Sequence, residues 1–513
     1  MINLSLLLLL LLGCFQPVFS IIQIDNDTLS DFDLAQRITS NNKSTGLQEF
    51  TPIIDTIVQS DVKYYSFDVN TTSGLGEFYE LLVFITGNIC TQPAGIPEND
   101  TSLAVYYSFN SSMFEDNEYG QMSLFSDGYM QALADLPIGQ VQTTEGYQPP
   151  TVLYIAVRAP ENTNSSASWT YQIGVSQNDL VFQWDDREWV KVLDTDDTSA
   201  IVVTGNLSIS EQYRRDKTMP YSLYVYSYGM KDYFTGLNNS WCAIRNGPAL
   251  IGPDSIATSF TNSLDGTRQQ FVVTGLNAST RYIGYVVAGS IGATTGGVVF
   301  HPFTFETMEN DACQLIYGLE FCTQVAYSVP RPQGDPSVNI TKQLYDNYTE
   351  NLYTNFSKAL QQIPCDAKPD SVFSNMKTCN DCANAYKDWL CAVMIPRCST
   401  KNITGYQLRE PNDGRNAFIN DVVVPNKTYF EVLPCVNTCY AIVRDCPSDF
   451  GFLCPTKLPM SYFWDVDTGE GNEQWPSCNY VGKVVAIQSS RAFKLVLNYG
   501  VLLVLLLGSY SVI

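Results

Sequence analysis

The sequence predicts a multidomain fold: two antiparallel β-sandwich domains at residues 21–180 and 181–310, followed by a disulfide-rich α-helical domain at residues 311–480. Three observations lead to this prediction. Up to about residue 310, short apolar segments alternate with clusters of Gly, Pro, Asn and Ser, which is typical of strands and turns. Beyond it, apolar residues recur with a helical period. Twelve of the 15 cysteines also fall between Cys313 and Cys478.

Five strand-like segments predict the first sandwich. In YYSFDV (64–69), Tyr65, Phe67 and Val69 alternate with Ser66 and Asp68, which is the period of a half-buried strand. The other four segments lie at 81–86, 102–109, 152–157 and 171–176. No long amphipathic helix competes with them, so we expect an all-β domain.

The second sandwich is predicted from FVVTGLNASTRYIGYVVAG (271–289), where Leu276 precedes a short turn and Tyr282 begins an alternating run. This pattern resembles the E–F corner of fibronectin type III domains, in which a tyrosine follows an inward-facing leucine. The resemblance implies a sandwich that presents surfaces or spaces neighbouring domains rather than one that carries chemistry.

Three segments predict the helices of the third domain. The stretch 341–365 places apolar or aromatic residues at 344, 345, 348, 352, 353, 356 and 360, close to a 3.6-residue period. A second stripe runs through Cys382, Tyr386, Trp389, Leu390 and Val393. In the segment 434–447 the cysteines at 435, 439 and 446 fall on one helical face, with prolines at both ends.

The C-x-x-C pair Cys379–Cys382 raises three alternatives: a zinc site, a redox pair or disulfides. A zinc site requires a second C-x-x-C or histidines, and a thioredoxin-like pair requires a βαβ unit, neither of which is present. An even set of cysteines in a secreted protein indicates disulfides, whose pairing the spacing leaves open. Cys90 and Cys242 lie in different β regions. Either they pair with each other across a domain interface, or one of them pairs with another cysteine. The disulfide candidates are Cys90, Cys242, Cys313, Cys322, Cys365, Cys379, Cys382, Cys391, Cys398, Cys435, Cys439, Cys446, Cys454 and Cys478.

The ends of the chain predict a secretory route. Residues 1–20 have the apolar core and small-residue end of a cleaved signal peptide, although an uncleaved anchor is the alternative. The hydrophobic tail within 481–513 predicts a lipid-anchor signal with Ser489 or Ser490 as the attachment site, or a single membrane span. Fourteen N-glycosylation sequons also predict an extracellular or lumenal chain. They lie at Asn26, Asn42, Asn70, Asn99, Asn110, Asn164, Asn206, Asn238, Asn277, Asn339, Asn347, Asn355, Asn402 and Asn426.

Charge and histidine content exclude several functions. The net charge of −23 argues against nucleic-acid binding, which needs a basic face. The chain has one histidine, His301, predicted as a packed or edge residue, so histidine-rich zinc sites are excluded. The acidic stretches DTDDT (194–198) and DVDTGEGNEQW (465–475) lack the frame of a calcium loop and are predicted as solvated loops. We expect no cofactor, no metal and no catalytic residue.

Four cysteine-rich motifs carry a family resemblance: YGLEFCTQVAYSVP (317–330), CNDCANAYKDWLCAVMIPRC (379–398), EVLPCVNTCYAIVRDCPSDFGFLCP (431–455) and CNY (478–480). In order and cysteine spacing they are similar to the C-terminal half of the fungal stretch-activated calcium-channel component family. The region also looks like the extracellular auxiliary subunits of animal sodium-leak channels and, more distantly, like the Frizzled cysteine-rich domain.

The resemblance implies a non-enzymatic accessory subunit of a plasma-membrane calcium channel, with a pool in the endoplasmic reticulum. It implies a large pore-forming partner related to voltage-gated channels and calcium entry after mating, stress or stretch stimuli. The matching cysteines, 379 to 478, would be scaffold, and exposed aromatic or charged residues near them would contact the partner. Three alternatives remain: a cation channel formed by the protein itself, a lipid-anchored cell-surface glycosidase, and a wall-linked structural glycoprotein.

Overall fold

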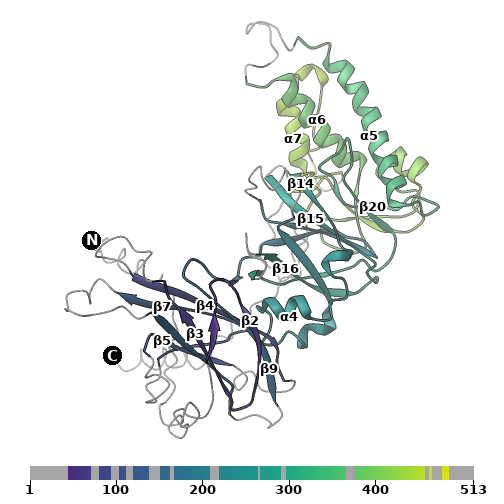
Figure 1. The fold of residues 1–513 in the computed structure, drawn as a ribbon. Helices are drawn as coiled ribbons and strands as arrows, with labels where there is room; N and C mark the ends of the chain where they lie inside the picture. The colour runs from purple at the N-terminus through teal and green to yellow at the C-terminus, as the bar shows by residue number, and fades with distance from the viewer. Residues whose placement is uncertain are drawn as a thin grey trace, which may run out of the picture.

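The protein is described from a computed structural model. The structure describes residues 44–70, 80–93, 103–110, 120–137, 151–161, 167–207, 219–263, 266–289, 296–364, 374, 376–456, 461–464 and 476–483. Two pairs of sheets and a helical region follow one another along an elongated molecule, with the N-terminal sheets at one end and helices α5, α6 and α7 at the other (Figure 1). The protein is therefore mostly β-sheet, with few helices and several disulfides.

The first pair of sheets covers residues 45–176. One sheet has the order β1-β3-β8-β5-β6 and the other the order β2-β9-β4-β7. Their bounds are β1 (Thr45–Leu47), β2 (Ile53–Val58), β3 (Val62–Asp68), β4 (Glu80–Thr91), β5 (Ala104–Ser108), β6 (Gln121–Leu124), β7 (Tyr129–Pro137), β8 (Val152–Arg158) and β9 (Ser168–Ser176). Each of the five predicted segments overlaps one of these strands, and the alternating residues Tyr65 and Phe67 are buried as predicted. Strands β1, β2, β6 and β7 were not predicted, because their polar or mixed sequences lack a clear alternation.

The second pair covers residues 182–306. One sheet has the order β11-β12-β15-β14; the other has the order β10-β17-β16-β13, and β18 also pairs with β16. Their bounds are β10 (Phe182–Asp185), β11 (Val190–Thr195), β12 (Ser199–Thr204), β13 (Tyr221–Ser227), β14 (Ala257–Ser263), β15 (Gly266–Thr274), β16 (Arg281–Gly289), β17 (Gly297–Phe300) and β18 (Phe303–Glu306). At the predicted corner Leu276 and Tyr282 are both buried. The backbone N–H of Asn277 donates to the Tyr282 hydroxyl at 2.8 Å, which fixes the turn before β16.

A short helix, α4 (Trp241–Asn246), lies between β13 and β14 in the chain and packs against β4 of the first pair of sheets, and it was not predicted. Ser240 accepts a hydrogen bond from the N–H of Ala243 and so caps the helix. The disulfide Cys90–Cys242 ties α4 to β4 across 152 residues of sequence. A single core cluster continues from the first pair of sheets through Trp241 to Tyr285, so the junction is packed as well as crosslinked.

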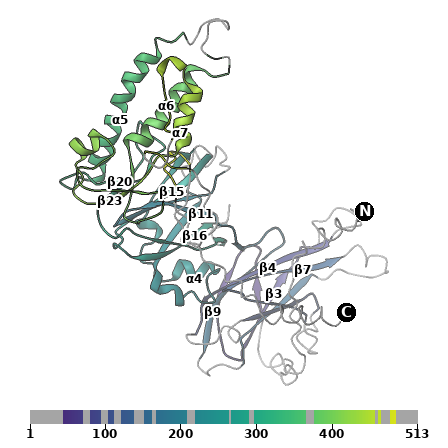
Figure 2. The ribbon, with the colours of Figure 1, turned by 180° about the vertical axis from the view of Figure 1, so that it is seen from behind.

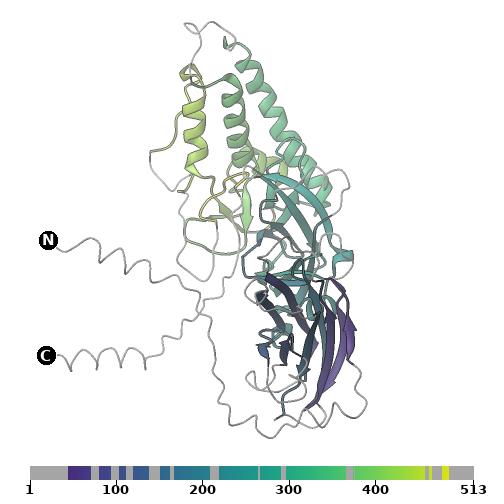
Figure 3. The same ribbon diagram turned by 60° about the vertical axis from the view of Figure 1, so that its left-hand side comes forward.

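The cysteine-rich region contains three long helices, α5 (Val338–Leu360), α6 (Cys379–Met394) and α7 (Val436–Asp445). Helix α6 lies between α5 and α7 (Figure 3). The prediction of a purely helical domain is incomplete, because the region also holds five short strands that lie beneath the helices (Figure 2). These are β19 (Cys313–Tyr317), β20 (Ala326–Pro330), β21 (Arg397–Ser399), β22 (Gln407–Arg409) and β23 (Tyr429–Val432), with the short turns η8 (Ile419–Val423) and η9 (Ser448–Phe450).

Candidate functional site

Helix α6 carries the C-x-x-C pair and is fixed from both sides. Thr378 and Asp381 form a capping box at its start, and the N–H of Thr378 holds the pKa of Asp381 below its usual value. The two cysteines do not bond to each other. Cys382 pairs with Cys446 at the end of α7, and Cys379 is also disulfide-bonded. Cys391, on the opposite face of α6, pairs with Cys322.

The other disulfides fix the segments around the helices. Cys435 and Cys439, at the start of α7, pair with Cys478 and Cys454, so two chain segments after the helix are tied back to it. The described residues hold six pairs: Cys90–Cys242, Cys313–Cys398, Cys322–Cys391, Cys382–Cys446, Cys435–Cys478 and Cys439–Cys454. Cys365 lies outside the described residues. The disulfide bonds that the composition predicts are present.

Aromatic rings fill the space between α5, α6 and η9. Phe356 stacks on Tyr386 with ring centroids 3.6 Å apart, and Phe450 and Phe452 pack against the same pair. Burial raises the pKa of the Tyr386 hydroxyl, so this group remains neutral at physiological pH. The predicted stripe on α6 therefore faces neighbouring helices, and its half-buried aromatic residues pack against other rings.

The outward face of α7 is mixed, because Asn437 and Arg444 are exposed on it together with Tyr440 and Val443. Tyr440 and Val443 are 44% and 45% exposed, and Leu453, held beside α7 by the disulfide of its neighbour Cys454, is 90% exposed. We call Tyr440, Val443 and Leu453 the α7 face. Exposed apolar side chains with polar neighbours on a disulfide-fixed helix are typical of a protein-binding surface.

Asp346 on α5 organises the first of the four motifs. Its carboxylate accepts hydrogen bonds from the backbone N–H groups of Glu320, Phe321 and Cys322, each at 2.8 Å. These bonds hold the turn between β19 and β20 against the helix, next to the Cys322–Cys391 disulfide. Since sequence reasoning considered only the cysteines of this motif, it missed Asp346, whose signal was an acid on the otherwise apolar side of α5.

The acidic stretch 194–198 is not a solvated loop, and that prediction is wrong. Asp194 and Asp196 are 1% and 3% exposed and lie between the second pair of sheets and the cysteine-rich region. Asp194 accepts a hydrogen bond from Arg397 Nε at 2.8 Å, and Asp196 accepts one from the N–H of Leu315 at 2.9 Å. Burial raises the pKa of Asp194, and the Arg397 charge opposes that effect. Asp194 and Asp196 therefore join the second pair of sheets to the cysteine-rich region. Their partners lie far away in the sequence, so these contacts form only in the folded protein.

A second buried carboxylate with ion pairs lies in the small sheet β21-β23-β22. Glu431 is fully buried, and both Arg409 and Arg415 donate to its carboxylate, Arg409 Nε at 2.7 Å. Arg415 also donates to the carbonyl of Ser461 at 2.8 Å. The two guanidinium groups neutralise a carboxylate that would otherwise be costly to bury. Sequence reasoning missed this group as well.

Nine of the ten sequon asparagines in the described ranges have exposed side chains, and Asn238 is half-buried. Asn26, Asn42, Asn99 and Asn164 lie outside these ranges, as do Ser489, Ser490, the predicted signal peptide and the acidic stretch 465–475. His301 is half-buried between β17 and β18, where its backbone N–H donates to the carbonyl of Asp185 at 3.1 Å and its Nδ1 lies 2.9 Å from the carbonyl of Pro302. In the part of the chain that is described, no three His, Cys, Asp or Glu side chains are grouped to hold a metal ion. No helix within the described ranges is long and apolar enough to cross a membrane.

Comparison with known proteins gives a consistent result. Residues 82–484 match the sequence profile of a family described as "Stretch-activated Ca2+-permeable channel component". The chain is 38% identical over 486 residues to the stretch-activated cation channel MID1 of Saccharomyces cerevisiae, covering 86% of this chain and 87% of that protein. It is 36% identical over 301 residues to the stretch-activated cation channel yam8 of Schizosaccharomyces pombe, covering 57% of this chain and 61% of that protein.

Similarity to solved structures adds nothing to this result. A glycoside hydrolase domain, endo-D from Streptococcus pneumoniae R6, covers 50% of this chain and 33% of that chain at 11% identity, with a TM-score of 0.17. That score is too low to indicate a shared fold. The family and relatives named above are channel components, so the predicted alternative of a cell-surface glycosidase is not supported.

Proposed function

Because the chain belongs to the family of stretch-activated Ca2+-permeable channel components, as the cysteine-rich motifs predicted, we propose that it is the extracellular accessory subunit of a plasma-membrane calcium channel. In this role it would bind a pore-forming subunit related to voltage-gated channels and support calcium influx after mating, stress or stretch stimuli. It would reach the plasma membrane through the endoplasmic reticulum as a glycoprotein, cleaved after residue 20 and held by a lipid anchor at Ser489 or Ser490 or by a single span.

One observation carries the proposal: the exposed apolar side chains of the α7 face lie on or beside a helix fixed by disulfides at both ends. A surface of this kind binds a partner with little loss of conformational entropy, since its backbone is already ordered. The predicted contacts near the cysteines would then be Tyr440, Val443 and Leu453, while the half-buried aromatic residues of α6 would support them.

We further propose domain boundaries near residues 180, 310 and 480. The strand order supports a fibronectin type III-like second domain, since β11-β12-β15-β14 and β13-β16-β17 correspond to the two sheets of an immunoglobulin-like sandwich. For the third domain, three neighbouring helices, of which α6 and α7 are linked by a disulfide, favour a Frizzled-like cysteine-rich domain, to which the short strands would be an addition.

The test uses cells that lack the endogenous accessory subunit and measures stimulated calcium uptake and copurification of the pore-forming subunit. We expect wild-type protein to restore both, and Val443→Asp to lose both while it is expressed and folded normally. Val58→Asp is the matched control, because Val58 is a similarly exposed valine, 52% against 45%, on the first pair of sheets. Normal uptake and copurification with Val443→Asp would refute the assignment of the α7 face.

A second candidate function follows from the names of the relatives, which are called stretch-activated cation channels. If the protein conducts cations itself, purified protein in a lipid bilayer should give tension-dependent currents with no other subunit present. Under the accessory function, that preparation is silent and calcium uptake requires the pore-forming subunit in the same cell. Currents from the protein alone would contradict the accessory function directly.

A further inference from the structure

A cavity of about 240 Å³ lies between the second pair of sheets and the cysteine-rich region. Strands β14 and β15 form one wall, and the segments 317–327 and 479–483 form another. Those two segments contain parts of the first and last of the four sequence motifs. No ligand has been proposed for these parts of the motifs so far. The cavity is smaller than those that enclose whole cofactors, so it suits one side chain or one small head group.

The lining of the cavity is unusually basic for this protein. It includes Arg268, Lys342, Arg397 and Lys483, and none of the lining residues is Asp or Glu. The whole chain has 52 acidic against 29 basic residues, so a group of four cations with no acid runs counter to the general composition. A concave surface lined by one sign of charge raises the local concentration of the opposite ion.

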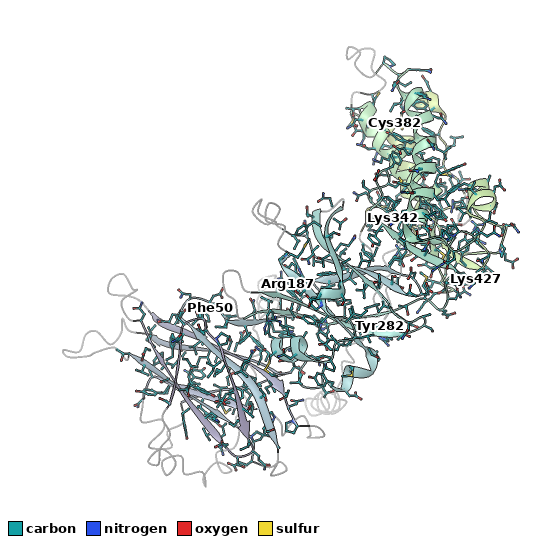
Figure 4. All side chains as sticks on the ribbon, turned by 45° about the vertical axis from the view of Figure 1, so that its right-hand side comes forward. Phe50, Arg187, Tyr282, Lys342, Cys382 and Lys427 are labelled. Carbon is teal, nitrogen blue, oxygen red and sulfur yellow. A yellow bond between two sulfur atoms is a disulfide. The ribbon has the colours of Figure 1, made fainter. Side chains whose placement is uncertain are left out.

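The four cations differ in what already holds them. Arg397 is neutralised by Asp194, and Arg268 Nη1 donates to the carbonyl of Thr204 at 2.9 Å. Lys342 lies over the ring of Tyr317, with its Nζ 5.2 Å from the ring centre, and forms no ion pair with any described residue. In Figure 4 Lys342 lies at the joint between the middle sheets and the helices. Its charge is therefore available to a ligand in the cavity.

A second group in the cavity favours a ligand that also donates a hydrogen bond. Gln324 Nε2 donates to the carbonyl of Asn262 at 3.0 Å, which fixes the orientation of the amide. The Oε1 atom of Gln324 is then buried with no hydrogen-bond donor among the described residues. A buried acceptor without a partner is costly, so a ligand N–H or O–H at this point would be stabilising.

We propose that this cavity binds the carboxylate or phosphate group of a ligand, with Lys342 as the main counter-charge and Gln324 as an acceptor for a neighbouring N–H or O–H. Because its walls come from two parts of the molecule, a bound ligand stabilises the joint between them. An acidic peptide and a phosphorylated small molecule are the two sources of such a group. The proposal concerns the purified protein and is independent of the channel function proposed above.

The experiment titrates the full chain, purified in detergent at low salt, with a triglutamate peptide and separately with inorganic phosphate. Binding is measured by calorimetry and by the shift of the unfolding temperature. We expect at least one probe to bind and to raise that temperature, and we expect Lys342→Gln to weaken its affinity about tenfold. Binding of the peptide identifies a carboxylate ligand, and binding of phosphate identifies a phosphoryl ligand.

The matched control is Lys387→Gln. Lys387 also lies over an aromatic ring, with its Nζ 4.5 Å from the centre of Phe321, but it does not line the cavity. Lys387→Gln should bind as the wild type does, and Lys342→Arg, which keeps the charge, should retain most of the affinity even if Lys342→Gln unfolds. The proposal is overturned if neither probe binds the wild type, or if Lys342→Gln and Lys387→Gln bind equally well.

Discussion

At the scale of single residues, the buried ion pair of Asp194 and Arg397 shows how two charges inside the protein can hold distant segments together. The Asp194 side chain is 2% exposed and that of Arg397 is 8% exposed. The backbone N–H groups of Thr195 and Ser328 also donate to the Asp194 carboxylate. The pair therefore ties the end of β11 to β20 and β21, and removing only one charge would leave the other buried and uncompensated.

We predict that Arg397→Met lowers the free energy of unfolding by about 3–5 kcal/mol, because the Asp194 carboxylate loses its counter-charge. Adding Asp194→Asn should recover part of that loss, since the second change removes the stranded charge. Urea unfolding of the purified variants measures both effects. Arg444→Met is the control, because the Arg444 side chain is 66% exposed and its pair with Asp445 should contribute less than about 1 kcal/mol. Equal losses for Arg397→Met and Arg444→Met would contradict the argument.

What the sequence could predict at this scale depends on distance along the chain. The contact of Tyr282 with the backbone of Asn277 spans five residues and was visible as a local pattern. The contact of Asp194 with Arg397 spans 203 residues, and nothing near either residue indicates the other. The stretch 194–198 predicts a solvated loop because it is an acidic turn without the frame of a calcium loop. The contact between Asp194 and Arg397 could therefore not be predicted from the sequence pattern.

At the scale of elements, α6 and α7 are joined by an ion pair as well as by a disulfide. Lys377, just before α6, lies 3.0 Å from a carboxylate oxygen of Asp445 near the end of α7. Hydrogen bonds from Arg444, and a smaller contribution from Lys377, hold the pKa of Asp445 below its ordinary value of 3.8. A basic residue near a helix C-terminus also interacts favourably with the helix dipole.

The lowered pKa of Asp445 predicts a stability loss in acid. Because the folded-state pKa lies below that of the unfolded chain, the contribution is fully present above about pH 4 and is lost as the pH falls through the folded-state pKa. We expect Asp445→Asn to be less stable than the wild type at neutral pH, with a difference that shrinks below about pH 4. Thermal unfolding across this pH range measures it. Asp335→Asn, which changes a carboxylate that is 74% exposed, should leave the acid side of the curve unchanged.

The disulfide Cys382–Cys446 is expected to contribute more to the helical layer than the shorter Cys439–Cys454, because it closes 64 residues of chain rather than 15. Replacing both cysteines of the longer pair with alanine should lower the free energy of unfolding by roughly 2–4 kcal/mol. The same change to the shorter pair should cost less. Urea unfolding under non-reducing conditions compares the two, and a larger loss from the shorter pair would show that packing, not chain closure, governs their effect.

The cysteine-rich region also shows which helices and strands can be predicted from the periodicity of apolar residues. The stripes of α5, α6 and α7 were readable because they extend over three to six turns with consistent spacing. Strands β21 and β22 have three residues each, too few for any alternation to appear. The helices were therefore predictable and the small sheet was not, although the sheet holds both Glu431 and Arg397.

At the scale of the whole molecule, two different connections join its three parts. The first and second pairs of sheets share a hydrophobic core and the Cys90–Cys242 disulfide. The second pair of sheets meets the cysteine-rich region through the Asp194–Arg397 pair and an apolar contact of Ile201, Val203 and Leu315. Both joints are therefore packed contacts rather than flexible linkers.

Removing the Cys90–Cys242 disulfide should test whether the first joint depends on the covalent bond. We predict that Cys90→Ala with Cys242→Ala lowers the free energy of unfolding by roughly 2–4 kcal/mol and separates one cooperative transition into two in scanning calorimetry. The N-terminal sheets would unfold first, because the shared core alone then holds them to α4. The Cys439→Ala and Cys454→Ala pair is the control, since that disulfide lies entirely within the cysteine-rich region and should leave the number of transitions unchanged. A single transition in the Cys90 and Cys242 variant would mean that the apolar contacts around Trp241 are sufficient to couple the two pairs of sheets.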